Sequence, residues 1–360
     1  MRRFSQSLQT LEINKTTELW EDILSRSIVT ADELPQGSGY NRTDIAVVTK
    51  KYPMFINPYY FNVIRSNPGL LKQAVPDIRE LTDPRGYLDP LNEEKFSPVP
   101  GLTHKYPGRV LFLISSKCAM YCRFCNRKRK VGNPSMVTER SIEEGLKYIE
   151  ETKAIKDVLL SGGDPLLLPD EKLDNILSRI KAIDHVEIIR IGTRIPCTLP
   201  QRITTNLLSI LKKYHPLYIN THFNHPLEIT PESSVACNML ADAGIPLGCQ
   251  TVLLKGVNDD KDIILELMRK LLTIRVKPYY LFQADLAKGT SHFWTPLQTG
   301  VEIMAGLQGY LSGIGVPRFV IDLPDGGGKI PVIPEYIKAV KGNEFIIRNY
   351  KGVEYKYPVI

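Results

Sequence analysis

Three cysteines stand close together in Cys118-Ala-Met-Tyr-Cys122-Arg-Phe-Cys125-Asn-Arg127, directly after the apolar run of residues 109–115. Their spacing, C-x3-C-x2-C, is one thiolate short of the four that complete an ordinary Cys₄ iron–sulfur cluster or a structural zinc site. A cluster held by three cysteines keeps one iron open to another ligand. The alternative, three buried or zinc-bound cysteines, is disfavoured because Arg123, Arg127 and Arg129 crowd the same stretch, where an apolar core would not place them.

Size and composition are those of a soluble globular protein. The chain has 360 residues, 43% hydrophobic and 24% charged, and α/β barrels routinely reach this length as one unit. No apolar run approaches the ~20 residues of a membrane span, and the first residues lack the apolar core of a secretory signal. Six cysteines without a paired framework indicate a reducing compartment. We therefore expect a cytoplasmic protein without a membrane partner, in which Cys197, Cys237 and Cys249 pack in the core.

The net charge of +7 raises the question of nucleic-acid binding. The basic residues are spread along the chain, however, and no basic stripe interleaved with aromatic residues is present, so we expect no nucleic-acid partner. Only Arg127-Lys-Arg-Lys130 is densely basic. Apart from Arg127, two interpretations remain open for this run: a solvated turn after the cysteines, or an anion-binding edge of an active site.

From residue 109 onward, apolar segments alternate with helical patterns, which predicts parallel β–α–β units. The predicted strands cover residues 110–114, 158–160, 186–191, 217–221, 247–254, 277–283 and 318–322. The predicted helices cover residues 141–152, 171–183, 204–214, 233–243, 261–272 and 299–312. Six or seven strands are too few for a closed eight-stranded barrel, so we predict an α/β fold with an incomplete barrel of the (β/α)6 type. Functional residues are expected at the carboxyl ends of its strands.

Two flanking regions complete the predicted organisation. Residues 1–104 are expected to form a mostly helical cap, starting with a helical pattern at residues 17–24, that packs on the main domain and carries no catalytic constellation. Residues 105–330 form the predicted barrel. Residues 331–360 contain Pro331, Pro334 and a short alternating pattern, which predicts a C-terminal extension folded as a small hairpin.

Polar and glycine-rich motifs follow the predicted strands. Ser161-Gly-Gly-Asp164 comes after the second strand, Gly192-Thr-Arg194 after the third and His222-Phe-Asn-His225 after the fourth. Gly162 and Gly163 would let the backbone approach a ligand closely, although a plain glycine-rich turn is the alternative interpretation.

A run of three glycines precedes a lysine in Asp322-Leu-Pro-Asp325-Gly-Gly-Gly328-Lys329-Ile-Pro331. A phosphate-binding P-loop is excluded, because that motif needs glycine in place of Leu323 and Ser or Thr in place of Ile330. The glycines predict a mobile backbone for Lys329. Such mobility suits an amine that forms and then surrenders a Schiff base to an aldehyde cofactor.

Together these motifs resemble those of the lysine 2,3-aminomutase family of radical S-adenosylmethionine (SAM) enzymes, from about residue 52 to about residue 355. The resemblance rests on Cys-x-Met-Tyr-Cys-Arg-x-Cys-x-Arg, Ser-Gly-Gly-Asp-Pro-Leu, Thr221-His-Phe-Asn-His-Pro226 and Gly-Gly-Gly-Lys329-x-Pro. It implies a radical SAM barrel. It also implies an isomerase that moves the α-amino group of L-lysine to the β-carbon, through a pyridoxal 5′-phosphate (PLP) aldimine and a 5′-deoxyadenosyl radical.

The resemblance also assigns roles to individual residues. The implied ligands of a [4Fe–4S] cluster are Cys118, Cys122 and Cys125. The implied contacts of SAM are Ser161, Gly162, Gly163, Asp164 and Gln250. The implied contacts of PLP are Tyr106, Arg109 and Lys329, the last of which would carry the cofactor. For the substrate, the resemblance implies that Arg127 grips the α-carboxylate and that Asp285 and Asp322 hold the side-chain ammonium.

Several alternatives stay open from the sequence. Arginine or glutamate could replace lysine as substrate, and a related branch of the family acts on a lysyl group of a translation factor. A radical SAM enzyme of another reaction class and a non-catalytic electron carrier are further possibilities. The implied partners are a small-molecule amino acid and a low-potential electron donor, and we expect a homo-oligomer. Some family members have cysteines near the C-terminus for an intersubunit zinc, whereas no cysteine follows Cys249 here.

Overall fold

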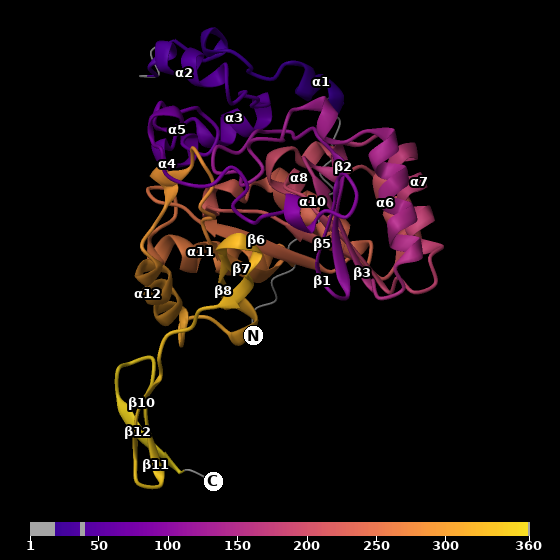
Figure 1. Ribbon diagram of the computed structural model, residues 1–360. Coiled ribbons are helices and arrows are strands. Elements are labelled where there is room, and N and C mark those ends of the chain that lie inside the picture. The colour runs from indigo at the N-terminus through magenta and orange to yellow at the C-terminus, as the bar shows by residue number, and fades with distance from the viewer. Residues whose placement is uncertain (1–18, 37–39, 359–360) are drawn as a thin grey trace, which may run out of the picture.

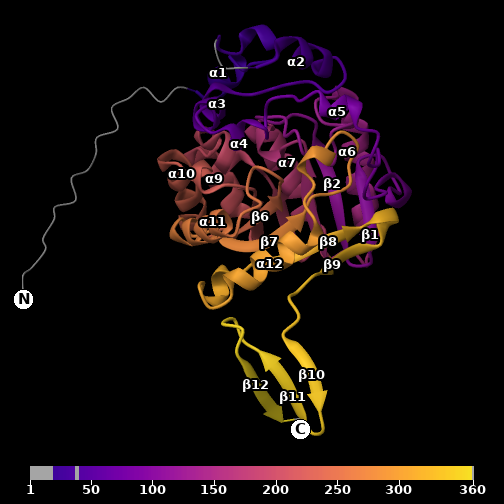
Figure 2. The ribbon, with the colours of Figure 1, turned by 90° about the vertical axis from the view of Figure 1, so that its left-hand side faces the viewer.

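The computed structural model describes residues 19–36 and 40–358, and a nine-stranded sheet forms its centre. The strands are β1 (Leu102–Tyr106), β2 (Arg109–Ser115), β3 (Asp157–Gly162), β4 (Ile188–Gly192), β5 (Leu217–Thr221), β6 (Leu247–Leu253), β7 (Lys277–Gln283), β8 (Arg318–Leu323) and β9 (Gly328–Pro331). Strands β2 to β8 pair in parallel in sequence order. The sheet curls into an incomplete α/β barrel (Figures 1 and 2), which confirms the predicted fold class.

Helices connect the parallel strands and cover the outside of the sheet (Figure 1). They are α6 (Glu139–Glu151), α7 (Asp170–Lys181), α8 (Ile195–Thr198), α9 (Thr205–Leu211), α10 (Pro231–Asp242), α11 (Lys261–Thr273) and α12 (Leu297–Leu307). Helix α7 buries Leu173, Ile176, Leu177 and Ile180, an apolar stripe at helical spacing that faces the sheet. None of the described helices is long and apolar enough to span a bilayer.

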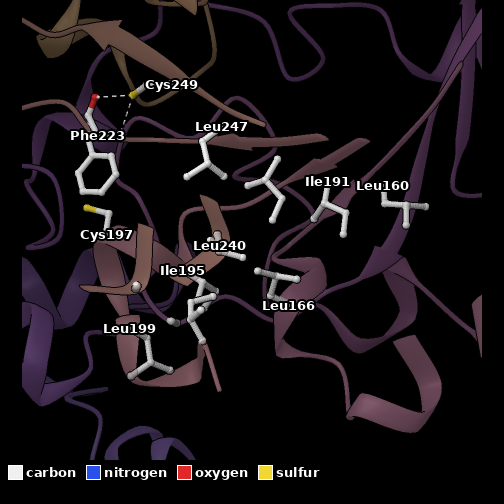
Figure 3. Close-up of a cluster of buried hydrophobic side chains, with 14 of the residues drawn as sticks. Leu160, Leu166, Ile191, Ile195, Cys197, Leu199, Phe223, Leu240, Leu247 and Cys249 are labelled. Atoms are coloured by element: carbon white, nitrogen blue, oxygen red, sulfur yellow. Dashed lines mark hydrogen bonds between the residues drawn. The ribbon is translucent and has the colours of Figure 1, made fainter. Parts of the chain in front are cut away.

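The core between sheet and helices holds the cysteines that lie outside the Cys118 stretch. Figure 3 shows Cys197 and Cys249 among the buried apolar side chains, with Cys249 hydrogen-bonded to the backbone of Phe223. Cys197 and Cys237 are 0% exposed and Cys249 is 1% exposed. The prediction that these three cysteines pack in the core is confirmed.

A mostly helical cap lies over one end of the barrel (Figures 1 and 2). Its helices are α1 (Trp20–Ser25), α2 (Arg42–Thr49), α3 (Pro58–Ile64), α4 (Pro68–Leu71) and α5 (Arg79–Thr82). The cap binds the cysteine loop through its backbone: Tyr121 donates to the Phe55 carbonyl at 2.9 Å, and Arg123 donates to the Gln73 carbonyl at 2.8 Å. Of the helical pattern predicted at residues 17–24, residues 17 and 18 lie outside the described part of the chain.

The two edges of the sheet are strands that the sequence did not predict, and both run antiparallel to their neighbours. Strand β1 pairs with β2, and β9 pairs with β8 so that Asp322 stands opposite Lys329. Strands β1 and β9 lie at opposite ends of the strand order, but they meet in space: the Lys329 backbone N–H donates to the Tyr106 hydroxyl at 3.0 Å. This hydrogen bond links the two edges of the curled sheet.

The C-terminal extension is a separate antiparallel sheet that stands away from the barrel (Figures 1 and 2). Its strands are β10 (Ile337–Lys341), β11 (Glu344–Arg348) and β12 (Glu354–Pro358). The prediction of a two-stranded hairpin is therefore wrong, because the extension has three strands. Strand β10 was not predicted from the sequence because Pro331 and Pro334 closely precede it and indicate a loop.

Candidate active site

One cavity of about 630 Å³ lies inside the barrel, and every residue that the sequence analysis assigned to a cofactor or substrate lines it. The set comprises Tyr106, Arg109, Cys118, Cys122, Cys125, Arg127, Ser161, Gly162, Gly163, Asp164, Gln250, Asp285, Asp322 and Lys329. The cavity extends from the cysteine loop, which follows the carboxyl end of β2, to Arg109 and Asp157, the first residues of β2 and β3. It therefore runs along the depth of the barrel.

The three cysteines of the loop reach the cavity as half-buried thiols. Burial raises the pKa of Cys118 well above its usual value, and burial together with the neighbouring Cys122 raises the pKa of Cys125 to about 11. Within the described residues, no group of three or more His, Cys, Asp or Glu side chains is placed to hold a single metal ion. Thiols of this kind lose their protons when irons coordinate them, and each of the three can serve a different iron of a cluster. The loop therefore fits a [4Fe–4S] group.

Arg194 joins the cysteine loop, called the cluster loop from here on, to the cap and to the barrel wall. Its Nη1 lies 2.9 Å from the Cys122 sulfur, and its Nη2 donates to Tyr60, Gln73 and Glu228 at 3.1, 2.9 and 2.9 Å. Glu228 is 0% exposed, so the guanidinium neutralises a buried carboxylate while it faces the sulfur. The sequence marked Arg194 only as part of a motif after a strand, because its partners come from distant segments.

Glu80 of the cap holds the turn around Cys125 by binding two cations that flank it. Both of its oxygens accept hydrogen bonds from Arg123, and Lys128 Nζ lies 2.5 Å from Oε2. Glu80 is 1% and Arg123 is 2% exposed. Burial, partly offset by Glu80, lowers the pKa of Lys128 to about 8. The cap thus holds the cluster loop with a buried ionic group, a role that the sequence analysis did not assign to it.

All four cations of the Arg127–Lys130 run pair with acids of the cap. Arg127 binds Glu93, Lys128 binds Glu80, and the shared acid Glu94 contacts Arg129 and Lys130 at 3.2 and 2.5 Å. Lys128, Arg129 and Lys130 are therefore neither a solvated turn nor an open anion site, whereas Arg127 also lines the cavity. Both interpretations failed for these three residues because the acids stand more than 30 residues away in the sequence, where no local pattern reveals the pairing.

The two glycines after β3 serve the packing of the cluster loop. A Cβ on Gly162 would meet the Ser115 carbonyl oxygen at 2.2 Å, and one on Gly163 would meet the Lys117 carbonyl oxygen at 2.3 Å. Only glycine therefore lets β3 lie this close to the loop, and Gly162 also has a positive φ of 123°. The close approach predicted for a ligand is made by the backbone of the chain itself.

The Asp164 carboxylate forms hydrogen bonds within the protein, whereas two other polar groups that line the cavity have no hydrogen-bond partner. Its carboxylate accepts hydrogen bonds from the Thr193 hydroxyl at 2.7 Å and the Arg194 backbone N–H at 2.8 Å, and burial raises its pKa to about 6. In the described part of the chain, Asn220 Nδ2 and Arg194 Nε are buried without a hydrogen-bond partner. Because buried polar atoms normally have partners, these atoms fit a polar ligand such as SAM.

Lys329 is held in place by both edges of the sheet. It lies in β9, its backbone donates to Tyr106, and its Nζ lies 2.8 and 3.1 Å from the two oxygens of Asp322. The predicted mobile backbone is therefore wrong. The glycines instead form the tight turn that brings β9 back along β8, with positive φ at Gly326 and Gly328.

The surroundings of Lys329 fit a phosphorylated aromatic cofactor. The Arg109 guanidinium stacks 3.9 Å from the centre of the Tyr106 ring, which gives this end of the cavity a positive charge for a phosphate. The rings of Tyr279 and Tyr280 lie 3.9 Å apart on the same wall, and Lys329 Nζ lies 5.3 Å above Phe282. This combination of a lysine, a cation and aromatic surfaces fits PLP.

Asp285 and Asp322 form the acidic part of the cavity. Asp285 accepts a hydrogen bond of 2.7 Å from Asn126, a residue of the cluster loop. Burial, with a further contribution from the charge of Asp322, raises the pKa of Asp285 to about 6, while the charges of Lys329 and Arg127 oppose the shift. The structure therefore brings together the two carboxylates that the resemblance assigned to one ammonium group.

Arg127 and Glu93 form a buried fork at the cluster side of the cavity. Arg127 Nε lies 3.0 and 3.1 Å from the Glu93 oxygens, and Nη2 lies 2.6 Å from Oε1. Both side chains line the cavity. Arg127, the proposed partner of the substrate carboxylate, is therefore already paired with the Glu93 carboxylate. Asp322, a proposed partner of the substrate ammonium, is likewise already paired with the Lys329 ammonium.

Comparison with known proteins places this site in a family. The Radical SAM superfamily model matches residues 112–268, and the lysine-2,3-aminomutase model matches residues 304–359. The L-lysine 2,3-aminomutase of Methanococcus maripaludis is 50% identical over 96% of this chain and 83% of its own length. This chain belongs to the lysine 2,3-aminomutase family. It is therefore a radical SAM isomerase, and its superfamily uses a [4Fe–4S] cluster and SAM.

Other members of the lysine 2,3-aminomutase family cover the chain to a similar extent. The L-lysine 2,3-aminomutase of Clostridium subterminale is 48% identical over 95% of this chain and 86% of its own length. The glutamate 2,3-aminomutase of Clostridioides difficile is 43% identical over 94% and 83%. The family thus includes relatives named for two substrates whose side chains have opposite charges.

Proposed function

We propose that this family member converts L-lysine to L-β-lysine by moving the α-amino group to the β-carbon. The observation that carries the proposal is the pair of carboxylates, Asp285 and Asp322, in one cavity with Arg127, Lys329 and the cysteine loop. Two carboxylates suit a cationic side chain, and Arg127 suits the carboxylate at the other end of the same amino acid.

The residues of the chain would then divide the work. Arg127 would bind the α-carboxylate, Asp285 and Asp322 would bind the side-chain ammonium, and Lys329 would hold PLP. Tyr106 and Arg109 would hold PLP, and Ser161, Gly162, Gly163, Asp164 and Gln250 would lie around SAM. The cluster and SAM supply the radical, and PLP supplies the electronics for migration of nitrogen, while the barrel wall excludes water.

The wider organisation supports the same proposal. We take residues 1–104 as the cap, 105–330 as the catalytic barrel and 331–360 as the extension. A homo-oligomer is supported by the exposed apolar side chains of the extension, among them Val340, Tyr355 and Tyr357 at 60, 56 and 54% exposure. A low-potential electron donor and a cytoplasmic location complete the proposal.

An anaerobic assay of an amino-acid panel tests the substrate. The reconstituted wild type should show its highest kcat/KM with lysine and a value at least about a hundredfold lower with glutamate, because a third carboxylate would meet Asp285 and Asp322. Arginine is the serious competitor, since its guanidinium can also meet two carboxylates. A preference for glutamate, or turnover of a lysyl group in a translation factor in place of free lysine, would contradict the assignment.

The raised pKa of Asp285 predicts how lysine binding depends on pH. The substrate ammonium favours the ionised carboxylate, so binding should release a proton and weaken by about tenfold for each pH unit below 6. Above pH 6 the group is ionised before lysine arrives, and the affinity should level off. Calorimetry with the PLP-loaded protein from pH 5 to pH 7.5 measures this. Asp285→Asn should abolish the slope, and an unchanged slope in that variant would rule Asp285 out as its source.

A further inference from the structure

We infer that Glu93 of the cap is a positioning residue for substrate recognition: it holds one edge of the Arg127 guanidinium and thereby presents the other edge to the α-carboxylate of the amino acid. The inference rests on the proposed function in that it takes an α-amino acid as the ligand of Arg127. Glu93 lies in the segment before β1, which the sequence analysis assigned to packing.

The geometry of the guanidinium separates its two edges. A guanidinium can bind one carboxylate through Nε and Nη2 and a second through Nη1 and Nη2. Glu93 occupies the first edge, with contacts of 2.6 to 3.1 Å. Within the described residues, Nη1 donates no hydrogen bond, and Arg127 lines the cavity. The second edge is therefore available to a ligand.

Sharing of Arg127 is favoured over displacement of Glu93. The Glu93 side chain is 7% exposed, and Arg127 is the partner of its carboxylate. A substrate that displaced it would leave a buried carboxylate without a cation, which is strongly destabilising. A substrate that binds the second edge leaves the pair intact, so the same cation serves both carboxylates.

Glu93 can fix the guanidinium because its own segment is fixed on both sides. We call residues 89–96 the acidic strap. On one side, Arg129 lies 3.1 Å from Asp89, whereas Glu94, whose side chain is 60% exposed, adds only surface ion pairs with Arg129 and Lys130. On the other side, a Cβ on Gly326 would meet the Phe96 ring at 2.2 Å, so the strap packs against the turn before Lys329. It thus spans from the cluster loop to the cofactor lysine.

Shortening the side chain while keeping its charge tests this role. Glu93→Asp retains the carboxylate but moves it back by one methylene, so the guanidinium must turn or lose its fork. Binding of L-lysine and of L-lysinamide, which lacks the carboxylate, would be measured by calorimetry with the cluster- and PLP-loaded protein in the absence of SAM. Glu94→Asp is the matched control, because it makes the same change one residue on, where the partners are Arg129 and Lys130.

We expect Glu93→Asp to weaken lysine binding by at least about tenfold and lysinamide binding by less than about twofold, as loss of a charge-assisted contact predicts. Glu94→Asp should change neither by more than about twofold. In an Arg127→Lys background, Glu93→Asp should add less than about twofold, because its effect passes through the guanidinium.

Equal weakening of both ligands, unchanged lysine binding, or additive losses in the double variant would overturn the inference. A Glu93→Asp protein that does not fold would overturn it as well, because Glu93 would then maintain the fold. If the wild type binds another α-amino acid in place of lysine, the same comparison is made with that amino acid and its amide. A wild type that binds no amino acid would refute the proposed function itself, and the inference with it.

Discussion

Replacement of Cys122 by alanine is expected to reduce the iron and sulfide content to background and to abolish the cleavage of SAM to 5′-deoxyadenosine. Each thiolate of the loop fixes one iron, and the loop has no fourth cysteine to substitute. The change also removes the sulfur that faces Arg194 Nη1 at 2.9 Å, so it disturbs the buried group that contains Glu228. The measurements are iron and sulfide analysis after anaerobic reconstitution, and product formation from SAM.

Cys237→Ala provides the matched control for that experiment. Cys237 lies in α10, is 0% exposed and does not line the cavity. Its replacement should leave the cluster and SAM cleavage in place, although the lost packing lowers the stability. Retention of iron, sulfide and SAM cleavage in Cys122→Ala would contradict the assignment of the cluster to this loop.

Asp322→Asn is expected to lower kcat/KM for lysine by roughly two to four orders of magnitude, because removal of one member of a buried charge pair costs about 3–5 kcal/mol. The Asp322 side chain is 4% exposed, so water cannot replace it easily. PLP loading, followed by absorbance, separates loss of substrate binding from loss of the PLP that Lys329 is proposed to carry.

Two comparisons sharpen this prediction. L-norleucine has no side-chain ammonium, so its binding should change little in Asp322→Asn while lysine binding collapses. Asp325→Asn changes an exposed acid three residues on, at a positive φ of 55° that asparagine tolerates, and should leave lysine turnover unchanged. An Asp322→Asn variant that still turns over lysine at the wild-type rate would remove Asp322 from the substrate site.

The barrel could be predicted from sequence because its strands are continuous apolar runs separated by amphipathic helices. The predicted strand at 217–221 and that at 277–283 coincide with β5 and β7, and the others differ at their ends by a few residues. The motifs that follow these strands meet in one cavity because the carboxyl ends of parallel strands share one edge. The order of the strands was therefore enough to bring the cysteine loop and the glycine pair together.

The remaining parts of the structure depend on contacts between distant segments. The edge strands β1 and β9 are short and follow turn signals, so local patterns favoured loops there. Glu80 and Glu93 are ordinary charged residues in the sequence, and only the folded chain brings them into contact with arginines that stand 43 and 34 positions further along. Asp164 lines the cavity, and its carboxylate also joins the ends of β3 and β4, which no sequence spacing reveals.

The hydrogen bond between Tyr106 and Lys329 joins residues 223 positions apart, and it bears on how the protein is made. At about 5–20 residues per second, the ribosome needs roughly 10–45 s to proceed from one to the other. During that time the cysteine loop exists, but the strand that carries Lys329 does not. The three cysteines are therefore synthesised well before Lys329, and the last strand of the barrel sheet completes the cavity.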